Sequence, residues 1–293
     1  VWRHNRALDD QPEREWSPIS RLGTAVSGFP PVAAYSGKLT FINESDHFLD
    51  CLAMDIDKAS HHCHVLTYIW TPEGKPATVA EALIRAAQRG VACRVLVDAV
   101  GCKHLLRSAI AARMRAAGVK VTPALPVNPL RMLFARIDLR NHRKIAVIDG
   151  RVAYTGSQNL TDSTFRSKKW RNTGPWIDAS VRLEGPAAQA LGLVFLRDWL
   201  MDSGEPLGDM SDFLPDLRPP VQNAPIVQVV PSGPGATPDA IRQAMLTTIY
   251  SAREEIVMTT PYFVPDDATR TALQAAATRG VSVTLVMPAI SDA

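Results

Sequence analysis

Residues 141–159 read Asn-His-Arg-Lys-Ile-Ala-Val-Ile-Asp-Gly-Arg-Val-Ala-Tyr-Thr-Gly-Ser-Gln-Asn. Two apolar runs, 145–148 and 152–155, flank an Asp-Gly pair, which is typical of a hairpin turn. Because side chains alternate between the faces of a strand, a strand starting before His142 places His142 and Lys144 on one face. The hairpin returns the Gly-Ser-Gln-Asn segment to the side of that strand. We therefore predict a single site built from both arms.

The residue types in this stretch suit a phosphodiester substrate. Lys144 offers a positive charge to non-bridging oxygens, and a neutral His142 offers a nucleophilic nitrogen. Ser157 and Asn159 add hydroxyl and amide donors for developing negative charge. His-x-Lys alone also occurs on solvated strand faces, and Asp-Gly is an ordinary turn. Six identities at fixed spacing, however, rarely coincide by chance.

The residues before the hairpin predict alternating helices and strands. Apolar residues at fourfold spacing in 45–59 indicate a helix with one buried face. Apolar runs at 64–70 and 92–97 predict buried strands, and 78–89 predicts a helix closed by Gly90. A third helix is expected over 103–117. The order strand, helix, strand indicates a right-handed parallel crossover and an α/β fold.

Part of this pattern recurs near the C-terminus. Ala-Leu, Arg-Gly-Val and Leu-Val at 82–83, 89–91 and 96–97 return at 272–273, 279–281 and 285–286, about 190 residues later. We interpret the chain as one complete repeat and the start of another. The predicted divisions are a lead-in (1–37), a first domain (38–214), a proline-rich linker (215–238) and the beginning of a second domain (239–293).

Composition narrows the class of protein. The 293 residues, 46% of them hydrophobic, suffice for two ordinary cores. No uninterrupted apolar run of about 18 residues predicts a membrane span. The net charge of +3 is compatible with anionic substrates or an anionic membrane surface. A dense basic stripe interleaved with aromatics, typical of nucleic-acid binding, is missing. Four cysteines without a CxxC pair predict reduced cytoplasmic thiols.

Several other residues have weaker interpretations. Asp178, on a strand expected over 176–183, is either a hydrogen-bond partner that fixes the tautomer of His142 or an ordinary surface aspartate. Asp98 ends a parallel strand, where open α/β sheets place their sites. A zinc site at Cys63 and its neighbouring histidines is disfavoured, because adjacent strand residues point to opposite faces. Core or interface packing, rather than lipid binding, is expected of Trp70, Trp170, Trp176 and Trp199.

The motif and its surroundings resemble a known family. His-x-Lys, Asp and Gly-Ser-x-Asn at this spacing form the defining motif of the phospholipase D superfamily. Three further stretches resemble the bacterial cardiolipin synthase branch of this superfamily. They are Arg-Leu-Glu-Gly-Pro at 182–186, the helix around 195–199 and Thr-Pro-Tyr-Phe-Val-Pro at 260–265. The resemblance covers nearly all of the chain from about Lys38 onward.

The resemblance implies a phospholipase D-like α/β/α sandwich in two halves, each giving one His-x-Lys strand to a shared cleft. His142, Lys144 and Asp149 would be catalytic, and Ser157 and Asn159 would bind substrate, without a metal or cofactor. The implied enzyme transfers a phosphatidyl group from phosphatidylglycerol to another phospholipid through a phosphohistidine. Its implied partners are anionic phospholipids and the bacterial cytoplasmic membrane surface, with no nucleic acid. The oligomeric state stays open.

Alternatives and departures remain. Within the same superfamily, a phospholipase D-type phosphodiesterase would let water take the second step, and a nuclease would act on nucleic acid; a non-catalytic module is a further alternative. The N-terminal membrane segments of many family members are absent, and so is a second His-x-Lys motif. The repeat offset would place that second motif beyond residue 293. We therefore expect a fragment that contains one half of a two-part site.

Overall fold

The computed structural model describes residues 22–25, 32–33, 39–125, 140–165, 176–209, 213–215, 226–233, 236–237 and 239–289. Trp170 lies outside the described residues, as do most of the lead-in predicted over 1–37 and much of the predicted linker. The domain limits predicted from sequence therefore stay predictions.

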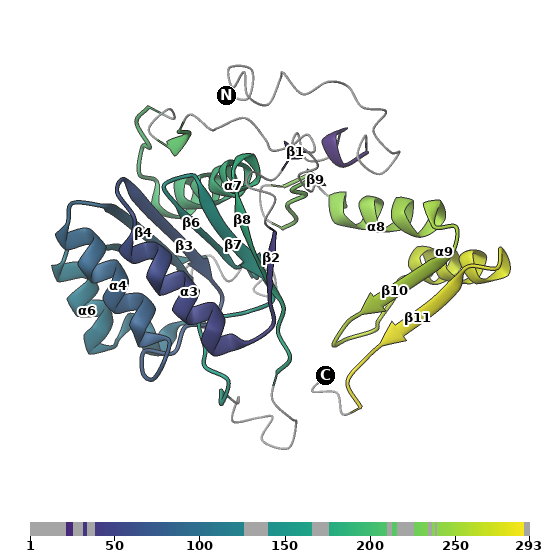
Figure 1. Cartoon of the computed structure of the whole chain (residues 1–293), viewed down its shortest axis with the longest axis horizontal. Helices are drawn as coiled ribbons and strands as arrows, with labels where there is room; N and C mark the ends of the chain where they lie inside the picture. Colours follow the sequence, from purple (N-terminus) through teal and green to yellow (C-terminus); the bar gives the residue numbers. More distant parts are fainter. Residues whose placement is uncertain are drawn as a thin grey trace, which may run out of the picture.

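A seven-stranded sheet forms the centre of the larger part of the molecule (Figure 1). Its strand order is β2-β8-β7-β6-β3-β4-β5. The strands are β2 (Thr40–Ile42), β3 (His62–Thr67), β4 (Ala92–Asp98), β5 (Lys120–Ala124), β6 (Ile145–Ile148), β7 (Val152–Gly156) and β8 (Ser180–Glu184). Strands β3, β4 and β5 are parallel, whereas β6, β7, β8 and β2 continue the sheet in antiparallel pairs. The expected parallel crossover and the expected hairpin are both confirmed.

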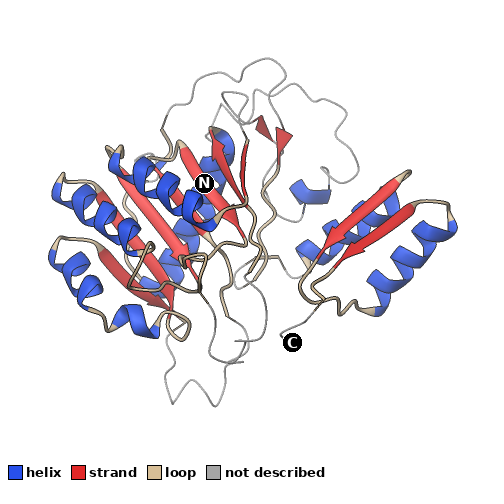
Figure 2. Cartoon of the chain, turned by 60° about the horizontal axis from the view of Figure 1, so that its bottom comes forward, coloured by secondary structure: helices blue, strands red, loops and turns tan. Residues whose placement is uncertain are grey.

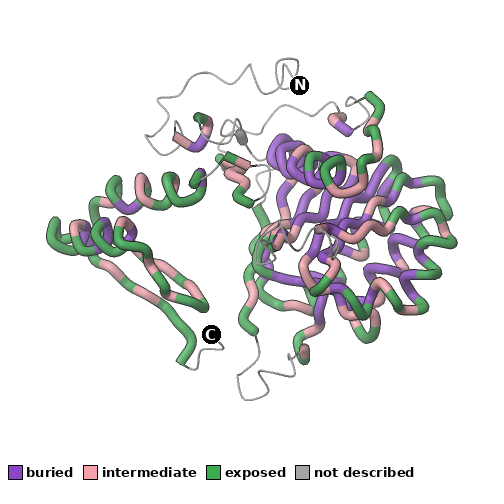
Figure 3. The backbone as a smooth tube through the Cα atoms, turned by 180° about the vertical axis from the view of Figure 1, so that it is seen from behind, coloured by how far each residue is buried: buried purple, intermediate pink, exposed green. Residues whose placement is uncertain are grey.

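Helices cover both faces of this sheet (Figure 2). The helices of the larger part are α3 (Ser45–Asp57), α4 (Ala77–Gln88), α5 (Lys103–Leu106), α6 (Ala109–Ala116) and α7 (Pro186–Ser203). One apolar core joins α3, α4 and α6 to the sheet, and a second joins α7 to the opposite face. The buried course of α7 is visible from behind in Figure 3. The architecture is therefore the predicted α/β/α sandwich, with every residue of β3 buried between the layers.

The prediction of a single helix over 103–117 is wrong in one respect. The structure breaks it into α5 and α6, because Ser108 adopts an extended conformation and caps α6 by accepting a hydrogen bond from the Ala111 amide at 3.3 Å. The serine hydroxyl satisfies a free amide at the start of α6, which favours a new helix start over continuation.

A smaller unit at the C-terminal end repeats the beginning of the larger one. It comprises α8 (Ala240–Ser251), β10 (Glu255–Thr259), α9 (Asp267–Thr278) and β11 (Ser282–Val286), with β10 and β11 parallel. This order matches α3-β3-α4-β4. Its own small core contains five buried residues, Ile249, Ala272, Leu273, Ala276 and Val281. Elsewhere, a short antiparallel pair joins β1 (Val32–Ala33) to β9 (Ile226–Val227).

Matching contacts support the internal repeat. The guanidinium of Arg89 donates to the carbonyls of Ile56 and Ala59 near the end of α3, and that of Arg279 donates to the carbonyls of Ile249 and Ala252 near the end of α8. The next residue in each copy is a glycine with a positive φ, 91° at Gly90 and 88° at Gly280. Only glycine adopts this backbone conformation at little cost. The repeated Arg-Gly-Val therefore closes a helix and anchors the preceding helix in both copies.

Within the described residues, no helix is both long enough and apolar enough to span a bilayer.

Candidate active site

The predicted site residues gather where several strands end at one edge of the sheet. Strand β6 begins at Ile145, opposite Leu66 of β3, so His142 and Lys144 precede β6 and lie beside the end of β3. The expectation that both residues belong to the strand is wrong. The strand begins later because the segment 140–144 does not join the backbone ladder. Its side chains bind carboxylates on neighbouring elements instead. Gly156, the last residue of β7, pairs with Ser180, which brings Ser157 to the same edge.

Tyr68 holds the imidazole of His142. The two rings are stacked, with centroids 4.1 Å apart and planes at 19°. Although His142 as a whole is exposed, this contact shields one face of its imidazole. Partial burial and the nearby Lys144 lower the pKa of His142 below its ordinary value, while Asp98 opposes them. The imidazole is thus biased toward the neutral form that a nucleophile requires.

Lys144 places its charge beside the same ring. Its ammonium donates to the main-chain carbonyl of His142 at 2.8 Å and lies 5.8 Å from the centroid of Tyr68. Burial lowers the pKa of Lys144, and the carboxylate of Asp178 opposes that shift. One ammonium therefore supports the histidine backbone and stays available to an anionic group at this edge.

Ser157 and Asp178 form the opposite side of the edge. The hydroxyl of Ser157 donates to the carboxylate of Asp178 at 2.6 Å and accepts from the Ala179 amide at 2.9 Å. The proposed bond between Asp178 and His142 is not formed in the described part of the chain. Asp178 instead orients Ser157 and faces Lys144 electrostatically. It precedes β8, which begins at Ser180 rather than at residue 176 as predicted.

Asn159 is buried and ties the hairpin to the strand beside it. Its side-chain oxygen accepts a hydrogen bond from the Ile69 amide at 3.0 Å, and the Leu160 amide donates to the Ile69 carbonyl at 3.0 Å. These bonds hold the Gly-Ser-Gln-Asn segment against the residues that follow Tyr68. The amide oxygen of Asn159 is thus used structurally, which leaves its NH₂ group as the donor of the predicted substrate-binding role.

Asp149 lies at the other end of β6. Its carboxylate accepts hydrogen bonds from the amides of Ser60, His61 and His62, each at 2.8 Å. Four strand residues separate it from Lys144, so the run from Lys144 to Asp149 spans about 16 Å at the rise of a strand. The structure therefore does not bring Asp149 together with His142 and Lys144. It anchors the turn of the hairpin to the start of β3.

An ion pair supports the segment that carries His142. Asp98 is 1% exposed, and its carboxylate accepts two hydrogen bonds from the Arg140 guanidinium, at 2.9 and 3.0 Å. It also accepts hydrogen bonds from the amides of Val100 and Gly101. The sequence position of Asp98 at a strand end indicated this neighbourhood, but the partner Arg140 was missed. A buried carboxylate needs such a bidentate cation, which was the available signal.

A second network surrounds Asn141 and Arg143. Both side chains donate to the buried carboxylate of Asp198 on α7, at 2.8 Å and 2.6 Å respectively. Arg143 also donates to the carbonyl of Ser232. The residues that alternate with His142 and Lys144 are therefore fixed from the α7 side of the sheet. Sequence reasoning missed this network, and it missed Tyr68, although Tyr68 directly follows a buried strand at the site edge.

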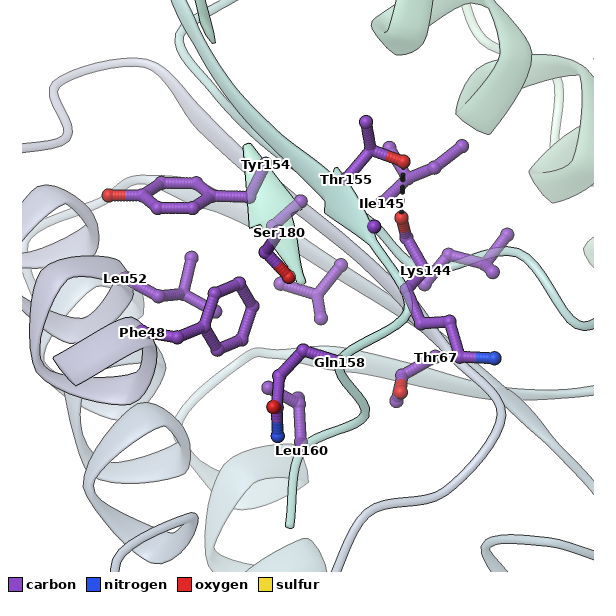
Figure 4. A pocket seen from close by; sticks show the side chains of 14 residues that line it. Phe48, Leu52, Thr67, Lys144, Ile145, Tyr154, Thr155, Gln158, Leu160 and Ser180 are labelled. Carbon is purple, nitrogen blue, oxygen red and sulfur yellow. Dashed lines mark hydrogen bonds between the residues drawn. The ribbon is translucent and has the colours of Figure 1, made fainter. Parts of the chain in front are cut away.

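A cavity of about 20 Å³ lies beside Lys144 on the α3 side of the sheet (Figure 4). Phe48 and Leu52 line it, and the ammonium of Lys144 points away from them. This volume holds about one water molecule, so neither a phosphate headgroup nor an acyl chain fits inside. A substrate phosphate therefore does not enter this cavity.

Together these groups can carry out one half of a phosphodiester displacement. A neutral imidazole can attack phosphorus, and the ammonium of Lys144 can balance the charge of the phosphate oxygens. The hydroxyl of Ser157 can donate to phosphate only by releasing its bond to Asp178, because it carries a single proton. An acid for the leaving oxygen must stand on the side of the phosphorus opposite His142.

Comparison with known proteins agrees with this geometry. The family model described as "Cardiolipin synthase, PLD-like domain" matches residues 52–177 and 245–293. Cardiolipin synthase A of Yersinia pseudotuberculosis serotype O:1b (strain IP 31758) is 43% identical over 286 residues, covering 94% of this chain and 56% of that protein. Cardiolipin synthase A of Yersinia pestis bv. Antiqua (strain Angola) matches to the same extent. The chain thus spans little more than half the length of these relatives.

Solved structures support the fold. The phosphatidylserine synthase of Haemophilus influenzae Rd KW20 superposes with a TM-score of 0.60 at 14% identity, covering 92% of this chain and 66% of that one. The polyphosphate kinase of Porphyromonas gingivalis gives a TM-score of 0.53 at 15% identity, covering 87% and 38%. At these identities the likeness concerns the fold alone. The matched family model, which covers segments of both repeats, shows that the chain belongs to the cardiolipin synthase family of phospholipase D-like proteins.

Proposed function

We propose that the whole protein is a phosphatidyltransferase that makes cardiolipin from phosphatidylglycerol at the bacterial cytoplasmic membrane. The observation that carries this proposal is the stacked, partly buried His142 next to the ammonium of Lys144, in a chain 43% identical to proteins named cardiolipin synthase A. A neutral imidazole fixed beside a cation is the arrangement that a phosphohistidine route needs.

The reaction proceeds in two displacements. A ring nitrogen of His142 forms a bond to the phosphorus of phosphatidylglycerol, and the bond from phosphorus to the headgroup glycerol oxygen breaks. A second acid, from outside the residues described here, gives that oxygen a proton. It then takes a proton from the headgroup hydroxyl of another phosphatidylglycerol, whose oxygen displaces His142. Two phosphatidylglycerol molecules thus give one cardiolipin and one glycerol, with Lys144 binding the phosphate oxygens throughout and Ser157 donating to them once its hydroxyl turns from Asp178.

Asp149 has a different role in this scheme from the one first expected. Because its carboxylate is occupied by three backbone amides at the far end of β6, we propose that it stabilises the hairpin and takes no part in bond making. Asn159 binds the strand beside the site with its oxygen and is proposed to reach substrate only with its NH₂ group.

The test is lipid mass spectrometry on the full-length protein with phosphatidylglycerol vesicles. Cardiolipin and glycerol are the expected products. Phosphatidic acid and glycerol without cardiolipin would show that water takes the second step, and the proposed transferase would be wrong. His142→Asn should lower turnover by several orders of magnitude, since the bypassed step has no other nucleophile. His61→Asn, an exposed histidine at the opposite edge of the sheet, is the matched control and should keep full turnover.

A further inference from the structure

Three apolar residues near the site, one half-buried and two exposed, belong to neither core of the larger part. We call Phe165, Trp176 and Ile177 the apolar lip. Ile177 is 95% exposed and Trp176 is 36% exposed, whereas Trp70 and Trp199 are each 1% exposed. The rings of Phe165 and Trp176 meet edge to face, with centroids 5.4 Å apart and planes at 62°. The lip is therefore a preformed pair of rings next to an isoleucine that is almost fully in solvent.

The lip borders the candidate active site directly. Ile177 is followed by Asp178, whose carboxylate accepts the hydrogen bond from Ser157 at 2.6 Å. The next residue, Ala179, exchanges backbone and hydroxyl hydrogen bonds with Ser157. Ile177 is therefore one residue away in sequence from the side chain that binds Ser157. A surface that buries Ile177 is held next to the groups proposed to bind phosphate.

Charge in the sequence selects the kind of surface. The ten residues that connect Phe165 to Trp176 contain four basic side chains, Arg166, Lys168, Lys169 and Arg171, and no acidic one. Basic residues next to tryptophan and aliphatic side chains suit an anionic bilayer surface, because the cations attract acidic headgroups while the apolar groups enter the acyl boundary.

We propose that the apolar lip inserts into the interface of an anionic phospholipid bilayer and so holds the site edge at the level of the headgroups. This inference rests on the proposed function, in which the substrate is itself a bilayer lipid. It explains why the cavity beside Lys144 need not hold acyl chains: the chains remain in the bilayer, and only the phosphodiester has to reach His142.

Binding of the 293-residue chain to vesicles tests the proposal without requiring turnover. In sedimentation with vesicles of phosphatidylglycerol and phosphatidylcholine, Ile177→Asp should weaken partitioning about tenfold to a hundredfold, as expected for removing one buried aliphatic side chain. Met54→Asp is the matched control, because Met54 is 51% exposed on α3 and lies about 13 Å along that helix from its site-edge end at Ser45. It should change partitioning less than about twofold.

Equal partitioning of wild type and Ile177→Asp, or an equal loss in Met54→Asp, would overturn the proposal. So would loss of a dimer in gel filtration of Ile177→Asp without any change in vesicle binding, which would make a second copy the occupant. In the full-length protein, Ile177→Asp should lose turnover on vesicles but keep it on monomeric short-chain phosphatidylglycerol. If the full-length protein makes no cardiolipin while the lip still governs vesicle binding, the proposed function fails and the lip stands.

Discussion

At the scale of single residues, a side chain outside the motif contacts its histidine directly. Tyr68 covers one face of His142 and lies close to the ammonium of Lys144. Burial is the first cause of the lowered pKa of His142, and the tyrosine ring supplies part of that burial. The motif identifies the nucleophile, but the protonation state of His142 also depends on Tyr68, which follows β3 and lies outside the motif.

Replacing Tyr68 should therefore move the titration of His142. In Tyr68→Ala the imidazole gains water on one face, so its pKa should rise toward the ordinary value of about 6.5. In Tyr68→Phe the stack remains, and the pKa should stay where it is in the wild type. NMR titration of the His142 ring in the 293-residue chain measures this directly. Identical titration curves for wild type and Tyr68→Ala would contradict the role given to the stack.

The burial of His62 should make the stability of the fold depend on pH. It is 4% exposed, stacks on His64 with centroids 4.5 Å apart, and has no hydrogen-bond partner for either ring nitrogen among the described residues. Burial, with a smaller effect from Arg94, lowers its pKa to about 4, while Asp149 opposes the shift. The unfolded chain, with a pKa of about 6.5, therefore binds the proton more tightly than the folded one.

The stability that comes from keeping His62 neutral is complete above about pH 6.5 and is lost as the pH falls through about 4. Its full size is about 3 kcal/mol, taken from the pKa difference. Urea unfolding at pH 7.5, 5.5 and 4.5 should show this loss in the wild type and a smaller loss in His62→Leu. His61→Leu, a change at an exposed neighbour, should keep the wild-type slope. A parallel pH dependence in all three proteins would refute the assignment.

At the scale of elements, the hairpin β6–β7 connects the two ends of the strands in the sheet. Its site end carries the segment with His142 and Lys144, and its turn holds Asp149 against the start of β3. Asp149 has a φ of 52°, a backbone conformation that Asn also tolerates. Asp149→Asn therefore isolates the effect of the charge and of the second acceptor oxygen.

We expect Asp149→Asn to lower the free energy of unfolding by about 2–4 kcal/mol, because hydrogen bonds to a charged acceptor contribute about 1.5–3 kcal/mol each and Asn retains one oxygen. Urea denaturation measures the loss. Asp57→Asn is the control, since Asp57 pairs with Arg85 at the surface, where such pairs contribute about 1 kcal/mol or less. A similar small effect for both variants would show that the three amide bonds contribute little.

Secondary structure was predictable from the sequence where a local pattern determined it. The predictions failed where tertiary contacts determined where an element begins or ends. Alternation and the Asp-Gly pair were enough for the hairpin, and the fourfold spacing was enough for α3. The start of β6 was predicted too early, because Asn141 and Arg143 bind Asp198 on α7 instead of joining the ladder. Likewise the roles of Asp178 and Asp149 depended on which end of a strand each one reached, and spacing alone does not reveal that.

At the scale of the whole molecule, the two copies of the repeat differ in how much they bury. All six residues of β3 are buried, whereas β10 and β11 alternate exposed and half-buried residues in a two-stranded sheet. The repeat itself was visible in the sequence, because Arg-Gly-Val closes a helix in both copies. The difference in burial was not, since it depends on what packs against each sheet.

This difference predicts unequal stability within one chain. A two-stranded sheet with one covered face is marginal alone, so the smaller unit should open far more often than the seven-stranded sheet. In hydrogen exchange we expect the amides of β10 and β11 to exchange at least about a hundredfold faster than those of β3 and β6. The repeat supplies the matched comparison, α9 against α4, whose sequences are similar and whose packing is not. Equal protection of the two copies would mean that the smaller core of Ile249, Ala272, Leu273, Ala276 and Val281 is sufficient by itself.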